Sequence, residues 1–154
     1  SPVLTVMTAA VRKAARSLQR DYGELANLQV SQKAPGDYVT AADQKVDKFL
    51  REELAKVRPG YAFLTEETGA VPGTDPEHRF IIDPIDGTMN FMRSVPFFAI
   101  AIALVRKGEL VAAITYNPMV LPKGVEPSAD PMLAARAAPY AVSLGRRLGE
   151  GAKQ

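Results

Sequence analysis

Two long helical patterns precede every candidate strand in this sequence, and this order restricts the folds open to the chain. Near the N-terminus, apolar residues recur at intervals of three or four, which predicts an amphipathic helix. These residues are Val3, Leu4, Met7, Val11, Ala14, Leu18, Tyr22 and Leu25. A second pattern of the same period begins at about Thr40, continues to Val57 and stops at Pro59-Gly60. We therefore expect two helices before the first strand.

Short apolar runs bounded by turn residues follow these helices. Residues 61–64 and 80–82 are too short for helices, and their composition predicts strands. Longer runs at 97–105 and 110–116 flank the segment 106–109, in which Gly108 can adopt a positive φ. This pattern predicts an antiparallel hairpin.

The pattern of helices and strands is clear only in the first part of the chain. Over residues 1–118 it predicts an α/β fold with helices and a sheet in layers. Residues 119–154 are rich in proline, alanine and glycine, and the Ala-rich stretch 132–138 is the one candidate helix there. We divide the chain at this point into an α/β portion and an atypical tail.

The composition excludes several kinds of site and partner. The chain has 154 residues, 47% of them hydrophobic, no cysteine and one histidine, His78. A Cys-ligated zinc site, a thiolate nucleophile and any site with two imidazoles are therefore excluded, although a Ser-His-Asp site stays open. Residues 1–118 hold 14 Lys and Arg against 14 Asp and Glu, so direct nucleic-acid binding is not expected. The absence of a long apolar run or signal-peptide pattern predicts a cytoplasmic protein without a membrane partner.

The segment 81–91 carries the clearest chemical signal. Its apolar start leads into Asp83 and Asp86, and Gly87 then permits a sharp turn. Two carboxylates at a strand end can hold a hard cation such as Mg²⁺, and the amides and hydroxyl of Gly87-Thr88 can cradle a phosphate beside it. The alternative is an Asx-type turn without any function.

Other acidic residues occur where they can join the same site. Glu66-Glu67 follow a predicted strand, and Asp43 lies near the start of the second helical pattern. Carboxylates from separate elements that meet in one cleft make a plausible metal site. The alternatives are a capping box at residues 40–43, a solvated turn at Glu66-Glu67, and exposed surface positions for Lys33 and His78.

Taken together, these motifs resemble the inositol monophosphatase family, which belongs to the phosphatase superfamily of the fructose bisphosphatases. The resemblance covers about residues 3–118 and is carried by segments 36–46, 64–69, 83–91 and 96–99. It implies alternating helix and sheet layers, of which this chain displays the N-terminal α/β half. Family members are much longer, and their later Trp-Asp-x-Ala-Ala-Gly segment supplies another metal-binding aspartate. This chain has no tryptophan, and residues 144–148 are a weak echo of the family's continuation.

The resemblance also implies roles for individual residues. The implied Mg²⁺ ligands are the side chains of Glu66, Asp83 and Asp86 and the backbone carbonyl of Ile85. Thr88 and Asp43 would be hydrogen-bonded to each other and, with Glu66, would orient and activate the attacking water. Gly87 and Thr88 would contact the substrate phosphate, and Lys33 would help to hold it or order an additional metal.

These roles imply Mg²⁺-dependent hydrolysis of a small phosphate monoester, with inositol monophosphate as the first candidate. The alternative is a catalytically weak family member that acts through protein association, in a regulatory or transcription-linked role. Because a half-fold leaves a sheet edge unpaired, we also expect a homo-oligomer and poor catalysis unless something completes the site.

Overall fold

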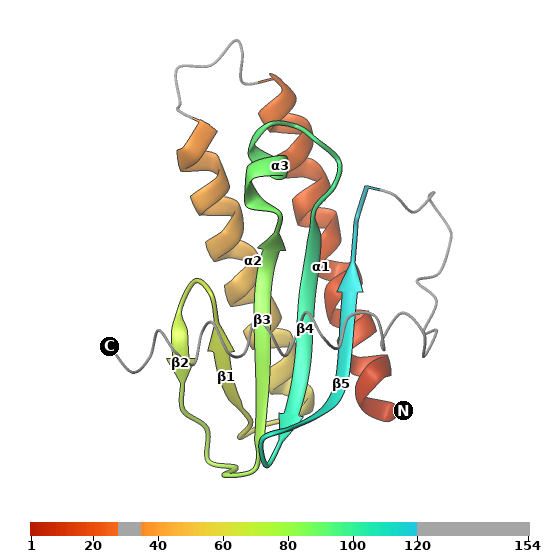
Figure 1. The fold of residues 1–154 in the computed structure, drawn as a ribbon, viewed down its shortest axis with the longest axis vertical. Coiled ribbons are helices and arrows are strands. Elements are labelled where there is room, and N and C mark those ends of the chain that lie inside the picture. Colours follow the sequence, from red (N-terminus) through yellow and green to blue (C-terminus); the bar gives the residue numbers. More distant parts are fainter. Residues whose placement is uncertain (28–34, 120–154) are drawn as a thin grey trace.

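The computed structural model describes residues 1–27 and 35–119, with side chains described for 1–24 and 41–119. Figure 1 shows two long helices, a mixed sheet and one short helix. In chain order the elements are α1 (Pro2–Asn27), α2 (Pro35–Val57), β1 (Ala62–Thr65), β2 (Gly69–Val71), β3 (His78–Asp86), α3 (Thr88–Met92), β4 (Ala99–Arg106) and β5 (Glu109–Tyr116).

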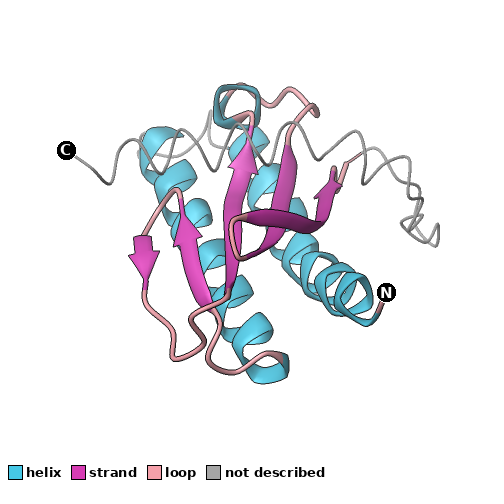
Figure 2. Cartoon of the chain, turned by 60° about the horizontal axis from the view of Figure 1, so that its bottom comes forward, coloured by secondary structure: helices cyan, strands magenta, loops and turns pink. Residues whose placement is uncertain are grey.

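The five strands form one sheet in the order β2-β1-β3-β4-β5. Strands β1 and β3 are parallel, whereas the other neighbouring pairs are antiparallel. Figure 2 shows both long helices on one face of this sheet. The described residues therefore form a helix layer packed on a sheet layer, as the α/β prediction requires.

The core lies between these two layers. Each long helix contributes an apolar stripe with the predicted period, and the sheet contributes alternate residues of its central strands. Fully buried members are Met7, Val11 and Leu18 of α1, Val46, Leu50 and Leu54 of α2, and Phe80, Ile82, Ile100 and Ile102 of the sheet. Burial of each such side chain contributes about 1.5–3 kcal/mol. A smaller cluster of strand residues, Leu64, Ile81, Ala103 and Ala113, lies apart from this core.

Both predicted helices are confirmed, but α2 begins earlier than the periodicity indicates. It starts at Pro35, a residue suited to the first turn of a helix, and not at about Thr40. Residues 40–43 therefore lie inside the helix, and the capping-box interpretation of this segment is wrong. Asp43 lies inside the helix, about two turns after its first residue.

Strand β3 is longer than predicted because it continues through Pro84. It ends at Asp86, and the pairing with β4 shifts register between Asp83 and Asp86. Such an irregularity accommodates a residue that cannot donate to the ladder, so proline does not end the strand here.

The predicted hairpin is confirmed, with a two-residue turn between β4 and β5. Lys107 and Gly108 both have positive φ, 49° and 81°, as a type I′ turn requires.

The three-residue strand β2 and the five-residue helix α3 were not predicted. Segment 132–138 and Lys33 lie outside the described residues. No helix in the described part of the chain is both long and apolar enough to cross a membrane.

Candidate active site at the strand ends

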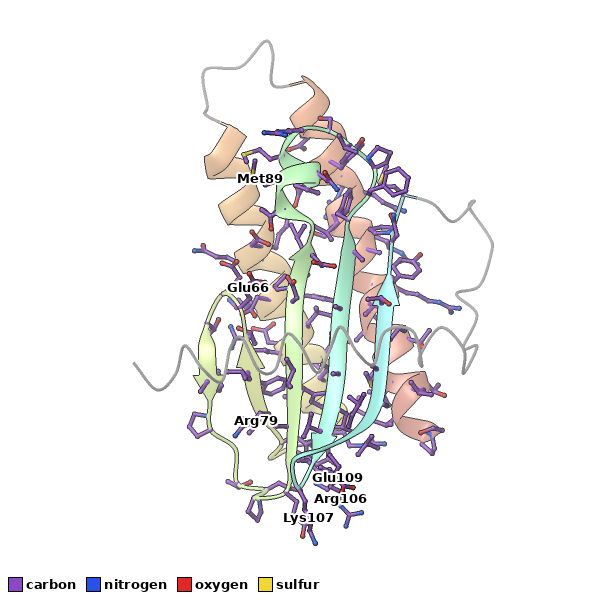
Figure 3. The ribbon with its side chains drawn as sticks, in the orientation of Figure 1. Glu66, Arg79, Met89, Arg106, Lys107 and Glu109 are labelled. Carbon is purple, nitrogen blue, oxygen red and sulfur yellow. The ribbon has the colours of Figure 1, made fainter. Side chains whose placement is uncertain are left out.

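Parallel pairing of β1 and β3 brings the ends of these strands to one edge of the sheet. Thr65 lies beside Ile82, and the next amide, that of Glu66, donates to the Ile82 carbonyl at 3.2 Å. This pairing places the backbone of Glu66 beside Asp83. In Figure 3 the exposed Glu66 lies at the end of β1, far from Lys107 at the opposite end of the sheet.

The two aspartates of β3 have different environments. Asp83 is buried, with 4% of its surface exposed, whereas Asp86 is only partly buried at the last position of the strand. The register shift between them places Asp83 opposite Ala101 and Asp86 opposite Ala99. Because of this shift, Asp83 and Asp86 are three residues apart in β3, while the residues paired with them are only two apart in β4.

Gly87 makes the turn that follows β3 possible. Its φ is +86°, and a Cβ at this position would lie 3.0 Å from the carbonyl oxygen of Phe97. Helix α3 starts at the next residue, where Asn90 and Phe91 donate the first amide hydrogen bonds back to the Gly87 carbonyl. The amides before Asn90 in this turn have no hydrogen-bond partner within the helix, so they are free of the helix ladder and can bind an anion.

The hydroxyl of Thr88 donates to the carbonyl oxygen of Ile85 at 3.0 Å. The resemblance implied a hydrogen bond between Thr88 and Asp43, but the hydroxyl proton is used on Ile85 in this structure. The physical reason is local, because the tight turn at Gly87 brings residues 85 and 88 together. Thr88 and the Ile85 carbonyl, two of the predicted site groups, are therefore in direct contact.

Asp43 lies in a strongly acidic environment although it belongs to α2. It is buried, with 7% of its surface exposed. The pKa of Asp43 is raised from 3.8 to about 7, chiefly by burial and then by the nearby charges of Glu67, Glu66 and Asp47. Burial and the charges of Glu66 and Asp47 also raise the pKa of Glu67. The structure therefore brings the acidic end of β1 against α2.

Asp47 was not predicted as a site residue, yet it connects α2 to the turn that carries Glu66 and Glu67. Its side chain is almost fully buried, and its Oδ2 accepts hydrogen bonds from Arg51 Nε at 2.9 Å and Thr68 Oγ1 at 2.6 Å. The spacing of Asp43 and Asp47, four residues on one helix face, was the available sequence signal.

The turn after β1 has a second hydrogen bond of its own. The Thr68 amide donates to the hydroxyl of the fully buried Thr65 at 2.8 Å. Thr65 and Thr68 therefore close the turn, and Asp47 fixes it to the helix. Glu66 and Glu67 occupy the two positions between these threonines.

The chemistry of the donor set fits Mg²⁺, because carboxylate and carbonyl oxygens are the ligands this cation prefers. Nearby negative charges, which add to burial in raising the pKa of Asp43, are also what a divalent cation offsets. However, within the described residues no group of three or more acidic or histidine side chains is close enough to hold a metal ion. Glu66, Asp83 and Asp86 therefore do not form a closed three-carboxylate cluster in this structure, and their roles as ligands stay a prediction.

His78 takes no part in this site. It is the first residue of β3, while Asp86 is the last, so about eight steps of roughly 3.3 Å separate them. Its ring stacks on Tyr61 with centroids 4.4 Å apart, and its Nδ1 lies 3.0 Å from Asp75 Oδ2. These contacts give His78 a structural role. The residue is partly buried, whereas we expected an exposed surface position.

We call the acidic residues near these strand ends the carboxylate corner: Asp43, Glu66, Glu67, Asp83 and Asp86. The fold and this corner define a class of protein, a helix-covered mixed sheet with acidic residues near the ends of its parallel strands. Comparison with known proteins specifies the class. The sequence profile of the inositol monophosphatase family matches residues 1–143. The chain belongs to this family.

Individual relatives are similar over much of the chain. It is 57% identical over 118 residues to an inositol-1-monophosphatase of Mesorhizobium japonicum, covering 77% of this chain and 44% of the relative. A Rhizobium meliloti inositol-1-monophosphatase is 47% identical over 154 residues, covering 100% of this chain and 54% of the relative.

A solved structure supports the same fold. The extragenic suppressor protein suhB of Bartonella henselae superposes with a TM-score of 0.68 at 54% identity, covering 77% of this chain and 46% of that one. The chain therefore spans about half the length of the curated relatives it matches.

Proposed function

We propose that this chain provides the strand-end part of a phosphatase site that hydrolyses small phosphate monoesters with Mg²⁺, inositol monophosphate being the first candidate substrate. The observation that carries the proposal is the burial of Asp43 close to the carboxylates of Glu67 and Glu66, which together raise the pKa of Asp43 to about 7. Such crowding is costly for folding alone, and it favours a bound cation. The names of the relatives support the choice of substrate.

Each residue of the corner has a defined part in this proposal. Glu66, Asp83, Asp86 and the carbonyl of Ile85 would hold Mg²⁺, which supplies polarisation of the phosphoryl oxygens and a lower pKa of water. The first amides after Gly87 would bind the phosphate, because they have no partner within α3. Thr88, Asp43 and Glu66 would orient the attacking water, and such positioning provides much of the rate enhancement in phosphoryl transfer.

Association between copies is a further part of the proposal. In the described sheet, β5 is an edge strand, and Val111 on it is 53% exposed. Phe97, in the segment before β4, is 68% exposed. An unpaired edge and exposed apolar side chains favour pairing with another chain, so we propose a homo-oligomer.

The decisive experiment measures phosphate release from a panel of inositol and sugar monophosphates, with Mg²⁺ and with a chelator. Asp86→Asn keeps the size of the side chain but removes a ligand charge, so we expect it to abolish Mg²⁺-dependent release while the melting temperature stays the same or rises. The matched control is Asp75→Asn at the other end of β3, which should keep the activity. Release that is independent of Mg²⁺, or unchanged in D86N, contradicts the proposal, and no release from any substrate favours the association role.

A further inference from the structure

A cavity of about 490 Å³ lies in the groove between α1 and α2. Its volume falls within the range of roughly 300–1,000 Å³ that is typical of small-molecule sites. Ala14, Val46 and Phe49 give it an apolar lining, and four cationic side chains also line it. None of its lining residues is acidic.

The groove is separate from the carboxylate corner. Phe49 and Lys45 each lie two positions from Asp47, and residues two apart on a helix do not share a face. The corner and the cavity therefore occupy different sides of α2, with opposite charge. An anion is repelled by the corner and attracted to the groove.

Two of the four cations are paired and two are not. Lys13 Nζ lies 3.0 Å from Glu53 Oε2, and Lys45 Nζ lies 2.8 Å from Asp21 Oδ2. Arg16 and Arg20 make no ion pair with any described residue. They are four residues apart on α1, so two like charges lie close together with no ion-pair partner among the described residues.

Ser17 adds a hydrogen-bond donor that also lacks a partner. Its Oγ is buried and makes no hydrogen bond in the described part of the chain. Ser17 lines the same cavity as Arg16 and Arg20. A buried hydroxyl without a partner is unusual in a folded protein, and a ligand that accepts its proton would remove the cost.

We propose that this groove is a second binding site, for a small organic phosphate with an aryl-sized apolar body. The guanidinium groups of Arg16 and Arg20 and the hydroxyl of Ser17 would bind the phosphate, whose three oxygens match several donors at once. The apolar body would lie against Phe49, Val46 and Ala14. Neither a bare anion nor a neutral aromatic compound uses both halves of this site.

The test uses phenylphosphonate, which has both parts and cannot be hydrolysed as a phosphate ester. We would titrate the isotopically labelled 154-residue chain without Mg²⁺ and follow amide chemical shifts. Saturable shifts should appear in α1 and α2 around residues 13–20 and 45–49, with an affinity at least tenfold above that for inorganic phosphate or benzyl alcohol.

Variants distinguish this site from a general attraction of anions to basic residues. R16Q/R20Q should lose at least tenfold in affinity, whereas R58Q/R79Q, which removes the same charge elsewhere, should not. Ser17→Ala should weaken binding several-fold without lowering the melting temperature, because the buried hydroxyl makes no hydrogen bond with the described residues. D86N should bind normally, so the result does not depend on the phosphatase proposal.

Several outcomes would overturn the inference. They are the absence of saturable shifts, equal affinity in R16Q/R20Q, and shifts confined to residues 83–88. Binding of an oligonucleotide or an acidic peptide to the groove without any binding of phenylphosphonate would also overturn it, since the occupant would then be a macromolecule.

Discussion

Asp43 carries its negative charge at a cost to the folded state. Its pKa is raised from 3.8 to about 7 by burial and by the charges of Glu67 and Glu66. Between these two pH values the folded protein therefore keeps a proton on Asp43 that the unfolded chain releases. The stability that comes from the protonated group is present below pH 4 and is lost as the pH rises through 7. Because water screens part of the interaction, we expect the loss to be about 1–3 kcal/mol.

The measurement is denaturant unfolding from pH 4 to pH 8 for the wild-type chain and for Asp43→Asn. The variant lacks the titrating group, so the difference between the two curves isolates Asp43 from all other ionisable residues. The variant should be the more stable protein at pH 8 and lose its advantage near pH 4. Parallel curves would mean that the charge of Asp43 is well solvated.

Gly87 gives a residue-scale test of the turn that starts α3. In Gly87→Ala the new Cβ meets the Phe97 carbonyl oxygen at 3.0 Å in addition to the strain of φ +86°. Gly69→Ala is the control, since φ there is +79° but no atom lies within 4 Å. Strain at a positive φ costs about 1–3 kcal/mol, and only the first variant should lose more than that. Equal melting temperatures of the two variants would contradict the close approach.

At the scale of elements, the hydrogen bond from Thr68 to Asp47 holds the acidic turn after β1 against α2. Thr68→Val removes the 2.6 Å hydrogen bond and leaves a buried carboxylate oxygen with one partner fewer. The expected cost is about 1–3 kcal/mol, with faster amide exchange at Glu66 and Glu67. Thr115→Val on the exposed surface of β5 is the control, and equal exchange in both variants would contradict the role of Asp47.

The sequence predicts those elements whose pattern extends over several periods. The two long helices and the β4–β5 hairpin have repeated apolar positions, and both are confirmed. The strand β2 has three residues and α3 has five, so neither contains enough positions for a period to show. The extension of β3 through Pro84 depends on a register shift against β4, which only the tertiary pairing reveals.

The candidate site was predictable to a similar degree. Asp83, Asp86 and Glu66 follow apolar strands, so their placement at strand ends could be predicted. The spacing of Asp47 from Asp43 indicates a shared helix face, but the burial of Asp47 could not be predicted. An aspartate inside a helix is ordinarily solvated, and only packing against the turn after β1 buries this one. The Thr88 hydroxyl depends on the exact turn geometry at Gly87, which allows the bond to Ile85.

At the scale of the whole molecule, the exposed edge strand predicts association of copies. Val111 is 53% exposed on β5, and a lysine there opposes edge-to-edge pairing. Sedimentation velocity should show an oligomer for the wild-type chain and a shift toward monomer for Val111→Lys. A wild-type chain that stays monomeric at all concentrations would remove this part of the proposal.

The proposed phosphatase activity depends above all on Mg²⁺ binding at the carboxylate corner. The most direct measurement is a Mg²⁺ titration of the labelled chain, followed by amide shifts and compared with D86N. We predict saturable shifts confined to Glu66, Asp83 and the Gly87 turn, with a large loss of affinity in D86N, because that variant lacks one ligand charge. No saturable shift, or equal binding by D86N, would contradict the metal site and the proposed phosphatase activity.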